Sequence, residues 1–129
     1  MALLVPNVGE QEMLKRILNA SSVIDNVKIH LYSDNVTPAE ADTIASYTLV
    51  TSPAAISLDG ESWDTTSVVG TASYAQQTFT YSGTGTAYGY VVTNDDGTIL
   101  LWAERFTDGP YEIPSGGGTI KITPSISLD

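Results

Sequence analysis

The 129-residue chain contains no cysteine and a single histidine, His30. Without thiols it forms neither disulfides nor thiolate metal sites, and one histidine is too few for the usual zinc ligand sets. No stretch approaches the ~18 consecutive apolar residues that a membrane-spanning helix needs. We therefore expect no metal, no cofactor and no membrane partner.

Positive charge is also scarce. The sequence has 5 lysines and arginines against 15 aspartates and glutamates, which gives a formal net charge of −10. Nucleic-acid binding depends on clustered positive charge that neutralises phosphates, so direct binding of DNA or RNA is not expected. The acidic balance predicts solubility through mutual repulsion. The alternative is an acidic face that meets a basic partner.

No arrangement of residues in the sequence indicates catalysis by a nucleophile. His30 alternates with apolar residues in the segment VKIHLY, residues 27–32, and no G-x-S-x-G motif accompanies it. We interpret it as a surface or interface histidine, and we do not predict an enzyme.

Acidic residues gather at two places, Asp59, Glu61 and Asp64 in one and Asp95 and Asp96 in the other. The spacing of a calcium-binding loop is absent from both, and an aspartate before a glycine is typical of a turn. A carboxylate pair of a glycan-active enzyme is the weakest alternative, because any acidic protein offers such pairs.

Most of the chain has the short alternating patterns of β-strands. Residues 27–32 alternate apolar and polar side chains, and residues 74–81 are rich in aromatic and β-branched types. About seven such segments with little helix predict a mainly β fold. We expect a single antiparallel β-sandwich or small barrel with a short N-terminal helix and an extended N-terminal arm.

The clearest turn signal lies between residues 88–93 and 98–106. The Asp96-Gly97 pair that separates these segments predicts a hairpin, because glycine tolerates the positive φ of a tight turn. Residues 98–106 are the most apolar segment, and we expect them to form a central strand. Leu100 or Trp102 is expected to face the core.

Two shorter patterns refine this arrangement. A proline after Thr37 and an acid at Glu40 predict a helical turn that begins at Pro38. Pro124 lies within the last predicted strand, residues 119–127, and indicates an edge position or a bulge there.

The N-terminus is apolar where chains usually fray into polar residues. We divide the chain into an arm and short helix, residues 1–22, and a β-domain, residues 23–129. We predict that the arm and the apolar face of the helix bind a neighbouring subunit, so that deleting residues 1–8 leaves the β-domain folded. The alternative is packing against the chain's own domain. The predicted partner-binding residues are Leu3, Leu4, Val5, Pro6, Met13, Leu14, Ile17 and Leu18.

Three segments carry a resemblance to a known group of proteins. They are VPNVGE leading into MLKRIL, LYSDNVTPAEADTIASYT at residues 31–48, and the block from Tyr88 to Leu128 that begins YGYVVTNDDG. The chain resembles small virion structural proteins of tailed bacteriophages over most of its length. None of these motifs is catalytic.

The resemblance implies a capsid decoration, or cement, protein that binds the outside of the head and stabilises it. Its partner would be the major capsid protein or another virion protein, and its location the head surface after synthesis in the host cytoplasm. The alternative is a tail, fibre or baseplate component that binds another tail protein or a host surface glycan. We also expect a homo-oligomer, with a trimer among the arrangements that the sequence leaves open.

Overall fold

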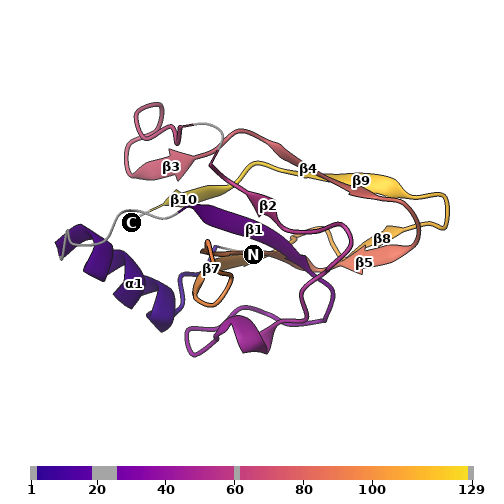
Figure 1. The fold of residues 1–129 in the computed structure, drawn as a ribbon, viewed down its shortest axis with the longest axis horizontal. Helices are drawn as coiled ribbons and strands as arrows, with labels where there is room; N and C mark the ends of the chain where they lie inside the picture. The colour runs from indigo at the N-terminus through magenta and orange to yellow at the C-terminus, as the bar shows by residue number, and fades with distance from the viewer. Residues whose placement is uncertain (1–2, 19–25, 60–61, 128–129) are drawn as a thin grey trace.

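The chain folds into antiparallel β-structure with one N-terminal helix (Figure 1). The computed structural model describes residues 3–18, 26–59 and 62–127, without the side chains of residues 15–18. The predicted mainly β class is confirmed. The elements are α1 (Asn7–Leu18), β1 (Val27–Tyr32), a 3-10 helix η1 (Ile44–Ser46), β2 (Ile56–Ser57), β3 (Thr71–Ser73), β4 (Gln77–Tyr81), β5 (Gly85–Ala87), β6 (Gly89–Asn94), β7 (Leu100–Arg105), β8 (Tyr111–Ile113), β9 (Gly118–Ile122) and β10 (Ser125–Ser127).

The strands form two layers. One layer is a four-stranded sheet in the order β2-β1-β6-β7, and the pair β5-β8 extends its β6-β7 hairpin. The other layer is a two-stranded ribbon, in which β4 pairs with β9 and β3 pairs with β10. The two pairs of the ribbon are joined by a hydrogen bond from the Tyr74 N–H to the Pro124 carbonyl, 2.9 Å long. The described residues form ten strands rather than about seven, and these do not close into the barrel that was one of the two predicted architectures.

Both faces of the four-stranded sheet are covered. The larger hydrophobic cluster fills the space between the layers, where Leu31 and Val92 of the sheet pack with Phe79 and Ile120 of the ribbon. A smaller cluster, which includes Tyr32 and Tyr47, lies on the other face of the sheet. A strand buried on both faces reads as a continuous apolar run rather than an alternation.

That double burial explains why β7 is so apolar, and it corrects its predicted position. Strand β7 lies at the edge of the four-stranded sheet, and β1 and β6 are the central strands. A β-bulge shifts the register between Val92 and Thr93 of β6, and it leaves Leu101 unpaired on β7. Leu100 and Trp102 are both buried, but in different clusters.

Two local predictions are resolved by hydrogen bonds. The hairpin turn before β7 is confirmed: Gly97 has φ +72°, and the Asn94 side-chain oxygen accepts the N–H groups of Thr98 and Ile99. A single turn forms where the helical turn after Pro38 is predicted: the Asp42 N–H donates to the Ala39 carbonyl at 3.0 Å, and the Asp42 carboxylate accepts the Ala39 N–H at 2.9 Å. The 3-10 helix η1 follows it as a separate element.

Candidate interaction surfaces

The N-terminal arm lies against the chain's own sheet. Leu4 forms an antiparallel bridge with Ala103 at the free edge of β7, through two backbone hydrogen bonds of 3.0 Å. Leu3 and Val5 pack against the core between the layers, and Pro6 is buried. This is the alternative named above, packing within the domain. Deleting residues 1–8 is therefore expected to destabilise the β-domain, and not to leave it folded as the sequence alone suggested.

Helix α1 continues this packing onto β7. A Cβ atom added at Gly9 would lie 2.1 Å from the Leu101 carbonyl oxygen, so the helix backbone approaches the strand as closely as a glycine allows. Met13 is half-buried against the core, whereas Leu14 is 55% exposed. The side chains of Ile17 and Leu18 lie outside the described part of the chain. A contact between these residues and a partner stays a prediction.

A short loop before β3 is held by one carboxylate. The Asp64 side chain accepts hydrogen bonds from the N–H groups of Thr66 and Ser67, at 2.9 and 3.1 Å. Hydrogen bonds from Ser67 and Thr66 lower the pKa of Asp64 to about 2. The backbone of Asp64 also pairs with that of Ser73, at 2.8 and 2.9 Å. Hydrogen bonds to Asp64 therefore hold the base of the loop, at Thr66, Ser67 and Ser73.

The tip of this loop carries two adjacent apolar side chains. Val68 is 61% exposed and Val69 is 96% exposed. The Val68 carbonyl accepts the Thr71 N–H at 3.2 Å, and Gly70 turns the chain with φ +76°. We call Val68 and Val69 the valine tip. Among the large hydrophobic side chains that the structure describes, only these two and Leu14 are strongly exposed.

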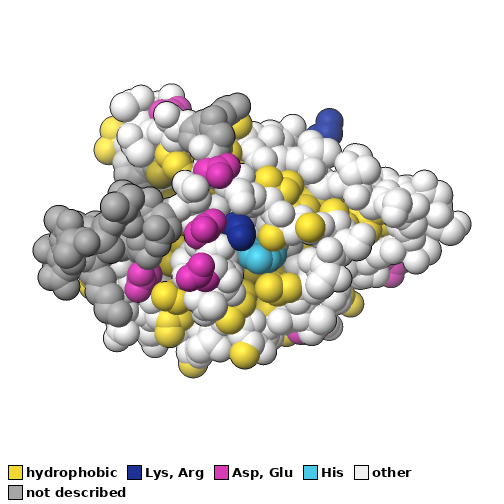
Figure 2. Space-filling model, in the orientation of Figure 1, with side chains coloured by type: hydrophobic (Ala, Val, Ile, Leu, Met, Phe, Trp, Pro, Cys, Tyr) yellow, Lys and Arg dark blue, Asp and Glu magenta, His cyan; other side chains and the backbone are white. Residues whose placement is uncertain are grey.

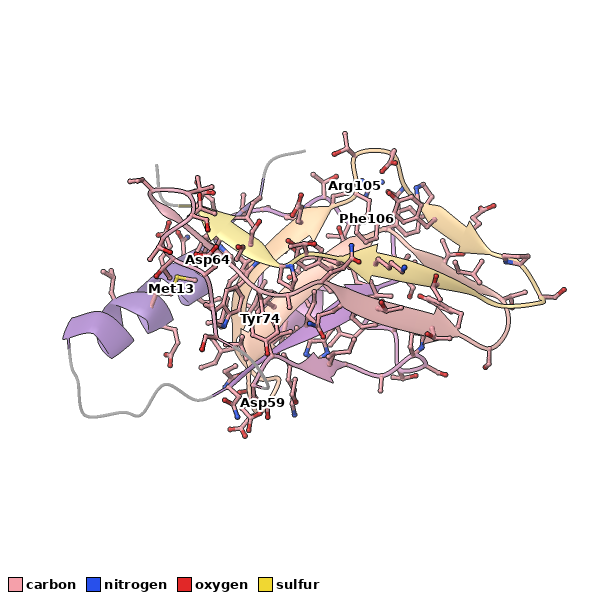
Figure 3. The ribbon with its side chains drawn as sticks, turned by 90° about the horizontal axis from the view of Figure 1, so that it is seen from above. Met13, Asp59, Asp64, Tyr74, Arg105 and Phe106 are labelled. Carbon is pink, nitrogen blue, oxygen red and sulfur yellow. The ribbon has the colours of Figure 1, made fainter. Side chains whose placement is uncertain are left out.

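A groove of about 310 Å³ opens beside the valine tip. It lies between α1, β7 and the β3–β10 end of the ribbon, and Figure 3 shows Met13 and Asp64 together at this end of the molecule. No charged residue lines it within the described parts of the chain. Its lining consists of Met13, Thr65, Gly70, Thr71, Ala72, Trp102 and Ile126.

His30 lies on the face shown in Figure 2, beside a cationic side chain and near several carboxylates. Its Nε2 atom is 2.9 Å from the Thr93 hydroxyl, which itself donates to the Asn94 carbonyl. Because that hydroxyl has one proton to give, Nε2 carries the proton of the neutral imidazole. Burial, followed by the charge of Lys28, lowers the pKa of His30. The partly buried histidine thus links β1 to β6 through the Thr93 hydroxyl.

The predicted acidic groups do not converge. Asp59 accepts a long hydrogen bond of 3.4 Å from Asn26, and Asp95 lies 3.9 Å from the ammonium of Lys28. Glu61 is outside the described residues. Across residues 3–18, 26–59 and 62–127 no group of three or more potential metal ligands is found. Where they are described, these carboxylates take part in turns and surface contacts.

Two tyrosines in the hydrophobic clusters hold carboxylates. The Tyr90 hydroxyl donates to Glu104 at 2.6 Å, and the Tyr47 hydroxyl donates to Asp42 at 2.8 Å. Burial, and then the bond to the carboxylate, raises the pKa of both tyrosines. Both stay protonated donors at neutral pH, which suits structural pairs rather than acid–base chemistry.

Comparison of the chain with protein-family models, curated proteins and solved structures found no match. Within its described part, no helix is both long enough and apolar enough to span a membrane.

The sequence analysis did not predict the valine tip or the groove beside it. The only signal was a pair of β-branched residues, Val68 and Val69, between a run of serines and threonines and Gly70. Such a pair resembles a short strand as much as an exposed tip, and nothing in the sequence shows that Trp102 and Ile126 come to lie beside it.

Proposed function

We propose that this protein is a structural component of a tailed-phage virion, and that it decorates the outside of the head and stabilises it. The observation that carries the proposal is the resemblance over residues 5–18, 31–48 and 88–128 to small virion proteins. Those three segments supply helix α1, the end of the central strand β1, the β6-β7 hairpin, and the β9 and β10 half of the ribbon, so they describe a fold rather than a reaction.

The way the polar groups are used supports a binding role. The carboxylates of Asp42 and Glu104 are bound by tyrosine hydroxyls, and His30 by the Thr93 hydroxyl. Arg105 donates to the Val36 carbonyl at 2.9 Å and to Asn35 at 2.6 Å, and its guanidinium lies 5.2 Å from the centre of the Tyr88 ring. These bonds stiffen the domain, and a rigid surface loses less entropy when it binds.

The acidic surface and one apolar residue of the helix suggest how the protein binds the capsid shell. A net charge of −10 favours a basic patch on the partner and raises the association rate at low salt. Leu14 is the most exposed of the predicted partner-binding residues whose side chains are described. We propose that it enters the contact with the shell.

The test is a reconstitution. Heads assembled without the protein are mixed with purified protein, and bound protein is counted by cryo-EM density and by gel after sedimentation. Density distributed over the whole head supports decoration, and density confined to the tail or to one vertex supports the tail, fibre or baseplate alternative. Absence of the protein from mature virions would contradict both.

A pair of variants then addresses the surface. Leu14→Ser removes an exposed apolar side chain, and Thr80→Ser changes an exposed residue on the outer face of the ribbon. We expect Leu14→Ser to lower occupancy on heads and Thr80→Ser to leave it unchanged. Equal occupancy for both would remove α1 from the proposed contact.

A further inference from the structure

We propose that two copies of this chain associate through the end that carries the valine tip, with the tip of each copy seated in the groove of the other. The proposed function is not needed for this contact, which purified protein alone can form. The occupant of the groove is thus a second copy of the chain.

The first reason is the exposure of the tip. Val69 is 96% exposed and Val68 is 61% exposed, and the two are adjacent, whereas ordinary exposed apolar residues are scattered singly. The loop that carries them is fixed at its base by the hydrogen bonds to Asp64. The loop beneath the tip is therefore partly ordered before binding, which lowers the entropy lost on binding.

The second reason is the chemistry of the groove. Its volume of about 310 Å³ corresponds to roughly ten water molecules at ~30 Å³ each. The side chains of Met13, Ala72, Trp102 and Ile126 offer that water few hydrogen bonds. Branched aliphatic side chains that replace the water bury apolar surface on both partners.

The third reason is the distribution of charge. A chain of net charge −10 repels its own copies, so self-contact requires a surface where charge is absent. Neither the valine tip nor the described lining of the groove contains a charged residue, and depletion of charge is typical of the core of a protein interface. The carboxylate at the base of the loop, Asp64, is occupied by the bonds within its own loop.

The positions of the tip and the groove on the molecule favour a dimer. Thr65, Gly70 and Thr71 of the loop also line the groove, so the protrusion and the recess share one end of the molecule. A two-fold axis through that end lets each tip enter the other groove, and the contact closes as a pair. The patch is smaller than the ~800 Å² per partner of a standard interface, so the pair is expected to be weak and reversible.

The experiment is sedimentation velocity on the full chain from about 1 μM to about 1 mM. We expect a reversible shift toward twice the 13.7 kDa of one chain. Raising the salt from about 50 mM to about 500 mM screens the like charges and is expected to strengthen the association. A contact made by acidic groups with a basic surface would weaken instead.

Two variants of equal charge separate the tip from a general charge effect. Val69→Asp and Thr80→Asp each add one negative charge at an exposed position, and only the first lies at the tip. We expect Val69→Asp to weaken association by at least about tenfold, because it places a charge in a water-excluded contact. Thr80→Asp is expected to have a much smaller effect. Circular dichroism and Tm should match wild type for both.

A variant on the opposite side of the contact tests the groove. Ala72→Leu fills the recess and leaves the tip intact, so it should also weaken association. Mixing it with Val69→Asp restores one tip-to-groove contact and should give a mixed pair more stable than either variant alone. The proposal is overturned if the wild type stays monomeric to about 1 mM, if Val69→Asp associates like Thr80→Asp, or if association falls with salt.

Discussion

Replacing Gly9 with alanine changes the free energy of unfolding through two effects of opposite sign, helix propensity and packing. Alanine is favoured over glycine inside a helix by about 1 kcal/mol, so helix propensity alone predicts stabilisation. The packing of α1 on β7 predicts the reverse. The added Cβ would lie 2.1 Å from the Leu101 oxygen and 3.0 Å from the Leu100 oxygen, and both atoms belong to the strand backbone.

The size of the loss follows from how far the helix must retreat. A contact of about 3 Å is the closest that a real Cβ tolerates, so the helix moves away by roughly 1 Å. A gap of that size forfeits a quarter to a half of the dispersion energy of each contact it opens. Val8 and Met13, both partly buried, pack through this helix, and burial stabilises each by at most about 1.5–3 kcal/mol, the value for a fully buried side chain. The packing loss expected is about 1–3 kcal/mol, in the usual range for overpacking, and the propensity gain of about 1 kcal/mol leaves a net loss of up to about 2 kcal/mol.

The measurement is urea denaturation followed by the fluorescence of Trp63 and Trp102, the two tryptophans of the chain. Gly83→Ala is the matched control, because a Cβ there meets nothing within 4 Å and the residue has no positive φ. We expect its free energy of unfolding to stay within about 0.5 kcal/mol of wild type. If Gly9→Ala is more stable than wild type by about 1 kcal/mol, as propensity alone predicts, α1 does not pack on β7 as described.

Three further predictions test the buried polar groups and the expected absence of metal. Tyr81→Phe should raise the free energy of unfolding or leave it unchanged, because the buried Tyr81 hydroxyl has no hydrogen-bond partner among the described residues. Tyr90→Phe should lower the free energy of unfolding by about 1–3 kcal/mol because it leaves Glu104 unpaired, and a larger loss for Tyr81→Phe than for Tyr90→Phe would contradict this. The pKa of His30 is lowered from its ordinary value of 6.5, so its stabilising contribution is present above that value and is lost as the pH falls through the folded pKa. The Tm of wild type should therefore fall more than that of His30→Gln between about pH 7.5 and 5.5, and parallel curves would refute this. Adding a chelator should leave the Tm unchanged, and a drop of several degrees would reveal a bound cation.

The strand content could be predicted because its signals are local. The alternation in residues 27–32 and the Asp96-Gly97 turn depend on neighbouring residues, and β1 and the β6-β7 hairpin form where they were expected. The position of β7 in the sheet could not be predicted in the same way. Double burial makes an edge strand as apolar as a central one, and only the distant pairing of Leu4 with Ala103 accounts for its covered edge.

The candidate surfaces were harder to predict, because exposure depends on tertiary packing. Leu14 and Met13 are adjacent in the helix and equally apolar in sequence, yet one faces solvent and the other the core. Val69 carries no sequence signal that separates it from a strand residue such as Val91, which is buried. The hydrophobic effect favours burial of all four side chains, and tertiary packing determines which of them stay exposed.

The pairing of distant segments has a consequence for how the chain reaches this state. Strands β9 and β10 complete the ribbon with β4 and β3, and Leu4 cannot bridge Ala103 until β7 is in place. Each layer therefore joins segments that lie far apart in the sequence. Folding is expected at the slow end of the range for small domains, since non-local pairings must overcome loop-closure entropy first. Until β7 is in place the apolar N-terminal segment has no strand to cover, and a chaperone that recognises extended apolar chain would meet it there.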